Sequence, residues 1–253
     1  MPGRQGCGAR GYVDPVTRAV PTFEHHHRRI QGGAARAAVF GASDGLVTNV
    51  SLILGVAGAH PTRGVVALVG LSGLVAGACS MAAGEYVSMK AQSELLEREL
   101  AIERREIHLR PEQELRELAS IYVRRGMDPE RAHDMARAMM ADPELALETH
   151  AREELGINPA NLGSPVAAAF SSFCSFAVGA LAPLVPWLVA AGESALFATI
   201  AVGVIAALGL GGGLAAFTGR SPTWSAIRQL AWATAAAGVT WSIGTLVGVG
   251  GIA

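Results

Sequence analysis

Two pairs of glutamates occur in the middle of the chain, and the members of each pair are three positions apart. Residues at this spacing lie on one face of a helix, so each pair predicts two neighbouring carboxylates. Pro111 separates the pairs, and a hairpin-like turn there would bring the two faces together. His150 and Glu154, four apart, offer two further donors. The pairs are Glu103 with Glu106 and Glu114 with Glu117.

Two interpretations of this set compete. Clustered carboxylates repel one another unless cations compensate them. Carboxylate oxygens and imidazole suit divalent ions such as Fe²⁺ and Mn²⁺, so the first interpretation is a metal site. Its predicted ligands are Glu103, Glu106, Glu114, Glu117, His150 and Glu154. In the second interpretation the glutamates form a solvated helix face, balanced by nearby arginines such as Arg104 and Arg116.

Two further acids, Asp44 and Glu85, lie in or at the end of strongly apolar stretches. An ionised acid at the centre of a bilayer costs about 2.5–3.5 kcal/mol on insertion scales, so such residues usually line a pathway. Met81 precedes Glu85 by one helical turn, and a thioether beside carboxylates suits a transition metal. We therefore expect Asp44, Met81 and Glu85 to line a transport route. A local capping role for Asp44 and ordinary packing for Met81 are the alternatives.

The composition indicates a membrane protein. Of the 253 residues, 51% are hydrophobic and 16% are charged, whereas soluble domains contain about 25% charged residues. Five apolar segments have the ~20 residues that a helix needs to cross a bilayer. They cover approximately 37–59, 64–89, 165–191, 194–217 and 229–252. Glycines four apart in four of them predict close helix packing and an oligomer. The predicted fold is an all-α, polytopic membrane protein.

The acidic residues are concentrated in one segment. Sixteen of the 21 lie between Glu94 and Glu154, with ten arginines among them. We expect a disordered tail at 1–34, two spans within 35–89, a helical module at 90–162 and three spans within 163–253. The helix of the second span should continue to about Leu109. In the module, Pro111 and two Asp-Pro-Glu sequences predict helix starts, and the last helix should end at Gly156. The histidine run 25–27 in the tail is a further potential metal-binding feature.

Arginine placement predicts the orientation. Six arginines precede the first span, and Arg220 and Arg228 separate the fourth from the fifth, whereas the loops after the first and third spans contain only Arg63. Because short cytoplasmic loops are enriched in arginine, the N-terminus and the module should be cytoplasmic. Abundant Ala and Arg with a single Lys suggest a bacterial plasma membrane. Interleaved acids and bases disfavour nucleic-acid binding, and isolated cysteines disfavour a disulfide framework.

The segments DGLVTNVSLILGVAGA and MAAGEYVSMKAQSELLERELAIERREI resemble the vacuolar iron transporter family. The resemblance extends from about residue 35 to the C-terminus. It implies a homodimer that moves Fe²⁺, sometimes Mn²⁺, out of the cytosol in exchange for protons, along a pathway between spans one and two of both subunits. It assigns Asp44, Met81 and Glu85 to that pathway, and to the cytoplasmic metal site Glu103, Glu106, Glu114, Glu117 and Glu154. One departure is His150-Ala151, where the family has a methionine pair.

The function expected is therefore proton-coupled metal transport without covalent chemistry or a permanently bound cofactor. Two alternatives remain. A membrane-anchored di-iron ferroxidase would use the glutamate cluster, but di-iron bundles usually carry two Glu-x-x-His motifs. Apart from Glu24 to His27 in the tail, this chain has one, from Glu130 to His133, and it lies outside the paired glutamates. In the other alternative, the module is a metal sensor that gates some other transport.

Overall fold

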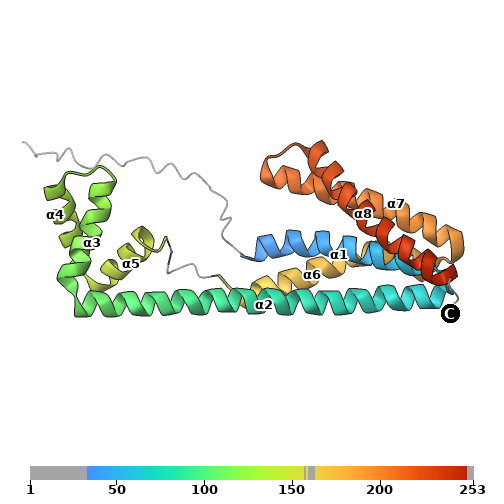
Figure 1. The fold of residues 1–253 in the computed structure, drawn as a ribbon, viewed down its shortest axis with the longest axis horizontal. Coiled ribbons are helices and arrows are strands. Elements are labelled where there is room, and N and C mark those ends of the chain that lie inside the picture. The colour runs from blue at the N-terminus through green and yellow to red at the C-terminus, as the bar shows by residue number, and fades with distance from the viewer. Residues whose placement is uncertain (1–32, 157, 159–162, 250–253) are drawn as a thin grey trace, which may run out of the picture. The chain divides into compact units, whose positions relative to one another are not determined.

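The computed structural model describes residues 33–156, 158 and 163–249. Within these residues the fold is entirely helical, which confirms the predicted class. Gly33 and Ala34, expected in the tail, already belong to the first helix, and the histidine run 25–27 lies outside the described residues. Figure 1 shows the eight helices: α1 (Gly33–Ala57), α2 (Arg63–Leu109), α3 (Pro111–Arg124), α4 (Pro129–Met140), α5 (Pro143–Glu153), α6 (Pro165–Val189), α7 (Gly192–Thr218) and α8 (Pro222–Val249).

Five of these helices, α1, α2, α6, α7 and α8, are long and apolar enough to cross a membrane. The prediction of five spans is thus confirmed, and α2 continues to Leu109 as expected. The last helix begins at Pro222 rather than near residue 229. The first turns of α8 contain polar residues, so an apolar run does not mark where the helix begins. Pro222 is itself a signal for the start, because proline favours the first helical position.

Glycines allow the backbones of the membrane helices to touch. A Cβ added to Gly45 of α1 would collide with the backbone of Phe176 in α6, and one added to Gly179 of α6 would collide with Ala42. Gly244 of α8 lies equally close to the backbone of Gly55. Between apolar helices in lipid, packing of this kind replaces the hydrophobic effect as the main attraction. A Cβ added to Gly209 or Gly213 would meet no atom of the described residues within 4 Å, so this predicted packing pair makes no close helix contact among them.

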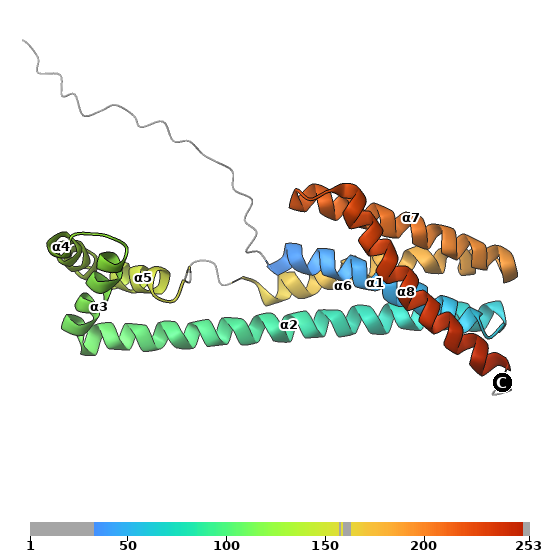
Figure 2. The same cartoon turned by 45° about the horizontal axis from the view of Figure 1, so that its top comes forward.

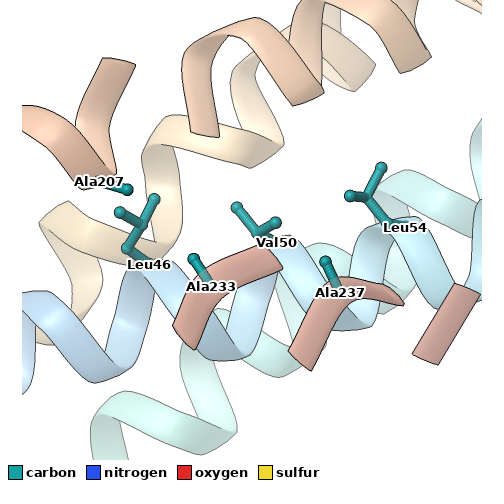
Figure 3. Packing of buried hydrophobic residues seen from close by; sticks show 6 residues of the cluster. All are labelled: Leu46, Val50, Leu54, Ala207, Ala233 and Ala237. Carbon is teal, nitrogen blue, oxygen red and sulfur yellow. The ribbon is translucent and has the colours of Figure 1, made fainter. Parts of the chain in front are cut away.

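Large residues of α1 fill the space opposite small residues of α7 and α8. Figure 3 shows Leu46, Val50 and Leu54 facing three alanines, and all six side chains are buried. The alanines lie on two helices, at positions Ala207, Ala233 and Ala237. Helix α1 is therefore held on one side by α6 and on another by α7 and α8, which fixes the residues that it carries.

Helices α3 and α5 pack against the last turns of α2, and α4 packs on α3 and α5 (Figure 2). Leu118 of α3 packs on Ala132 and Ala136 of α4, while Ile107 of α2 packs on Leu147 of α5. The two predicted aspartate caps are present: Asp128 accepts a hydrogen bond from the Glu130 amide (3.1 Å), and Asp142 accepts one from Glu144 (2.9 Å). The last of these helices ends at Glu153, three residues before the predicted Gly156.

Candidate metal-binding site

Three helices bring acidic side chains and one imidazole to a common point. Glu103 lies two turns before the end of α2, and Glu114 lies in the first turn of α3. Arg110 alone separates these helices, so the chain turns there as the proline predicts. His150 belongs to the last turn of α5, and Glu154 caps that helix. The packing of α3 and α5 on α2 therefore decides which acids meet.

His150 is the centre of this group, which we call the donor cluster (Glu103, Glu114, His150 and Glu154). Its side chain is fully buried, and Glu103 and Glu114 are only 5% and 4% exposed. The Nδ1 atom lies 3.1 Å from Glu103 Oε1, 3.5 Å from Glu154 Oε2 and 3.9 Å from Glu114 Oε2. One donor atom each from Glu103, His150 and Glu154 lie within 4.8 Å of one another.

These short distances are not accompanied by aligned hydrogen bonds. Both ring nitrogens of His150 and Oε1 of Glu103 are buried without a hydrogen-bond partner. An unsatisfied buried polar group costs about 1–3 kcal/mol. Two ligands that are each about 2.1 Å from one metal ion and at right angles are about 3 Å apart. The donor cluster thus has the spacing and the unused lone pairs that a divalent transition metal requires.

The electrostatics of the donor cluster favour a cation or protons. Burial raises the pKa of Glu114, and the negative charges of Glu103, Glu117 and Glu106 raise it further. Burial likewise raises the pKa of Glu154, with Glu103 and Glu117 adding to the effect. Burial alone would lower the pKa of His150, but the adjacent Glu103, Glu154 and Glu114 outweigh it and raise that pKa. These shifts favour either protonation of the cluster or the binding of a cation.

The other two predicted ligands, Glu106 and Glu117, occupy less enclosed positions. Glu106 is half-buried and Glu117 is exposed. Both act on the cluster through their negative charge. The solvated-face interpretation required the glutamates to be exposed and paired with local arginines. Instead, Arg104 lies beside Glu144 (3.4 Å), Arg116 binds the Glu112 carbonyl, and Glu103 and Glu114 are buried.

An open cleft of about 760 Å³, lined by both apolar and charged residues, lies between α2 and α5. Its charged lining comprises one arginine, Arg104, and four acids, which are Glu97, Asp142, Glu144 and Glu148. Leu147 belongs both to this cleft and to the packing of α5 on Ile107. A cation near this part of the chain therefore meets a negative potential.

The three residues expected in the membrane have separate neighbours within the chain. Asp44 is half-buried and accepts a hydrogen bond from Thr48 of its own helix (3.3 Å). Met81 packs against Phe176 and the adjoining alanines of α2 and α6. Glu85 forms an ion pair with Arg36 (2.9 Å). The structure brings α1 and α2 together but does not join these three side chains in one contact group.

The comparison with known proteins bears on what this arrangement serves. The chain matches the VIT family over residues 35–245. This chain belongs to the VIT family. It is 39% identical over 166 residues to a vacuolar iron transporter of Acanthamoeba castellanii, covering 66% of this chain and 60% of that protein. It is 30% identical over 206 residues to one of Centaurea cyanus, covering 81% and 83%. A vacuolar iron transporter of Toxoplasma gondii is 30% identical over 237 residues, covering 88% and 78%.

Two polar contacts near the predicted site residues were not predicted from the sequence: the ion pair of Arg36 and the hydrogen bond of Asn49. Arg36 contributed only to the predicted orientation in the membrane. Its partner Glu85 is 49 positions away, so the local spacing of residues does not indicate the pair. Asn49 is fully buried and donates to the Ala180 carbonyl (2.6 Å), which ties α1 to α6. An amide within an apolar run is a visible signal for such a tie, since buried polar groups are usually hydrogen-bonded.

Proposed function

We propose that the protein transports a divalent transition metal, Fe²⁺ with Mn²⁺ as a further substrate, out of the cytosol in exchange for protons. The observation that carries this proposal is the buried donor cluster with its unused lone pairs. Membership of the VIT family, whose relatives are named as vacuolar iron transporters, supports transport over catalysis. The protein is then a secondary transporter, and the metal is its substrate rather than a resident cofactor.

The donor cluster captures the ion. Glu103, His150 and Glu154 supply the first ligands, and Glu114 adds a nearby negative charge. Because the pKa values of His150, Glu114 and Glu154 are raised, protons compete with the metal for these groups. Neutral imidazole, in the place of the family's thioether, makes capture depend on pH.

The membrane residues carry the ion onward. Met81 offers a soft thioether and Asp44 a negative charge that offsets a partly dehydrated cation. Once the ion has left, Asp44 and Glu85 take up protons, which resets the carrier. The arginine distribution supports a cytosolic module and thus export from the cytosol.

A homodimer supplies the second half of this route in the proposal. One face of α2 is exposed and rich in small residues, which permits the close approach of a second copy. Its small members are Ser72, Ala76, Cys79 and Ala83, which lie beside larger exposed side chains such as Val75.

Transport into proteoliposomes tests the proposal. In vesicles with an acidic lumen, the purified protein should accumulate Fe²⁺ and raise the luminal pH in proportion, because protons leave as the metal enters. Glu130→Gln, which removes an exposed charge on α4 outside the donor cluster, should transport Fe²⁺ like the wild type. Oxygen consumption measured in the same vesicles separates transport from ferroxidase activity. Consumption of oxygen without accumulation of iron would contradict transport.

A further inference from the structure

The ion pair between Arg36 and Glu85 joins the start of α1 to the middle of α2. Arg36 Nη2 donates to Glu85 Oε1 at 2.9 Å. The Glu85 side chain is only 13% exposed, whereas that of Arg36 is 66% exposed. Helix α6, the third helix here, contains no charged residue, and Lys90 of α2 lies beside Glu94. Among the residues that the structure describes, Arg36 is therefore the cation that neutralises Glu85.

The backbones that carry this pair are firmly held. Ala37 packs with Met89 of α2 and Ala168 of α6 in a buried cluster. Ser171 of α6 donates to the Ala34 carbonyl at 2.8 Å. Because α1 is fixed on both sides of Arg36, release of Glu85 requires only that the exposed arginine side chain rotates away. Such a rotation is fast compared with movement of a helix.

The ion pair, Met81 and Asp44 lie at successive positions along the axes of α1 and α2. Met81 precedes Glu85 by one turn of α2, about 6 Å along the axis, and Asp44 follows Arg36 by about 12 Å along α1. Helix α2 continues from Glu85 toward the donor cluster. Glu85 is consequently the carboxylate that an ion from the donor cluster reaches before Met81 and Asp44.

We propose that Arg36 competes with the transported metal for Glu85 and leaves it when the ion arrives. This inference rests on the proposed function. The guanidinium cannot lose its proton, so its charge and that of a divalent ion exclude each other at one carboxylate. When Arg36 returns, it weakens the hold of Glu85 on the ion, which moves on, and the carboxylate is not left as an uncompensated buried charge.

Steady-state transport into proteoliposomes tests this competition through KM and kcat separately. Arg36→Gln should lower the apparent KM for Mn²⁺ about fivefold, which corresponds to about 1 kcal/mol at 25 °C, and lower kcat because release slows. Arg36→Lys should resemble the wild type. Arg228→Gln, the same charge change at an exposed site on α8, should change neither parameter. An unchanged KM and kcat in Arg36→Gln would overturn the inference.

A charge exchange separates competition from a structural ion pair. The double variant Arg36→Glu with Glu85→Arg can re-form the pair, so it should melt within a few degrees of the wild type. It should not transport, because the acid now lies on the other helix in an exposed position. Recovery of transport by the exchange would show that only the pair matters and would overturn the inference. Failure of the wild type itself to transport either Fe²⁺ or Mn²⁺ would overturn the proposed function together with this inference.

Discussion

Replacing Glu103 by glutamine tests the donor cluster without changing its shape. The amide keeps the size of the side chain and one oxygen, but it removes a negative charge that is 5% exposed and 3.1 Å from His150 Nδ1. Loss of one partner from a buried charge pair costs about 3–5 kcal/mol. The mutation also removes the repulsion that Glu103 exerts on Glu114 and Glu154 in the metal-bound protein, and this returns part of that cost. A net loss of about 3 kcal/mol lowers metal affinity about 150-fold.

Glu117→Gln is the matched control, because it removes the same charge from an exposed residue on α3. Exposed charges are screened by solvent and salt, so its effect should stay below about fivefold. Isothermal titration of Mn²⁺ or Co²⁺ into the full-length protein in detergent measures both variants. Equal losses in the two variants would refute the donor cluster, since they would mean that a diffuse negative surface holds the ions.

Three further predictions follow from the same geometry. Metal affinity should fall as the pH is lowered, and the fall should begin above pH 6.5 because the pKa of His150 is raised from that value. His150→Met should flatten this profile in titrations between pH 8 and 5.5, and an unchanged profile would remove His150 from the site. The melting temperature of the metal-free protein should fall as the pH rises from 5 to 8. A group whose pKa is higher in the folded than in the unfolded protein stabilises the fold fully below its unfolded-state pKa, and this stabilisation is lost as the pH rises through its folded-state pKa. Calorimetry should show that Mn²⁺ restores the melting temperature, whereas a melting temperature that rises with pH would contradict the prediction. Asp44→Asn should abolish transport in proteoliposomes while metal binding by the donor cluster persists, whereas near-normal transport per folded protein would defeat the pathway assignment.

The helices could be predicted from sequence because their signals are local. Pro111, Asp128 and Asp142 mark helix starts through their own backbone geometry and side-chain hydrogen bonds, and all three are observed. Apolar runs of sufficient length likewise indicated the five membrane helices. The start of α8 differed because Pro222 and the polar turn after it precede the apolar run.

The donor cluster could be predicted only in part, because helical spacing does not say which member of a pair turns inward. Glu103 and Glu106 share a face, yet Glu103 is buried and Glu106 is half-buried. That difference arises where Ile107 packs on Leu147, a contact between helices distant in sequence. The same limit applies to Arg36 and Glu85, whose pairing depends on how α1 and α2 pack.

Anomalous diffraction from crystals grown with Mn²⁺ tests the central claim most directly, because it locates the ion among named atoms. The predicted result is an anomalous peak within about 2.0–2.4 Å of a His150 ring nitrogen and of oxygens from Glu103 and Glu154. A peak coordinated by surface carboxylates alone, with His150 still buried away from the metal, would contradict the account.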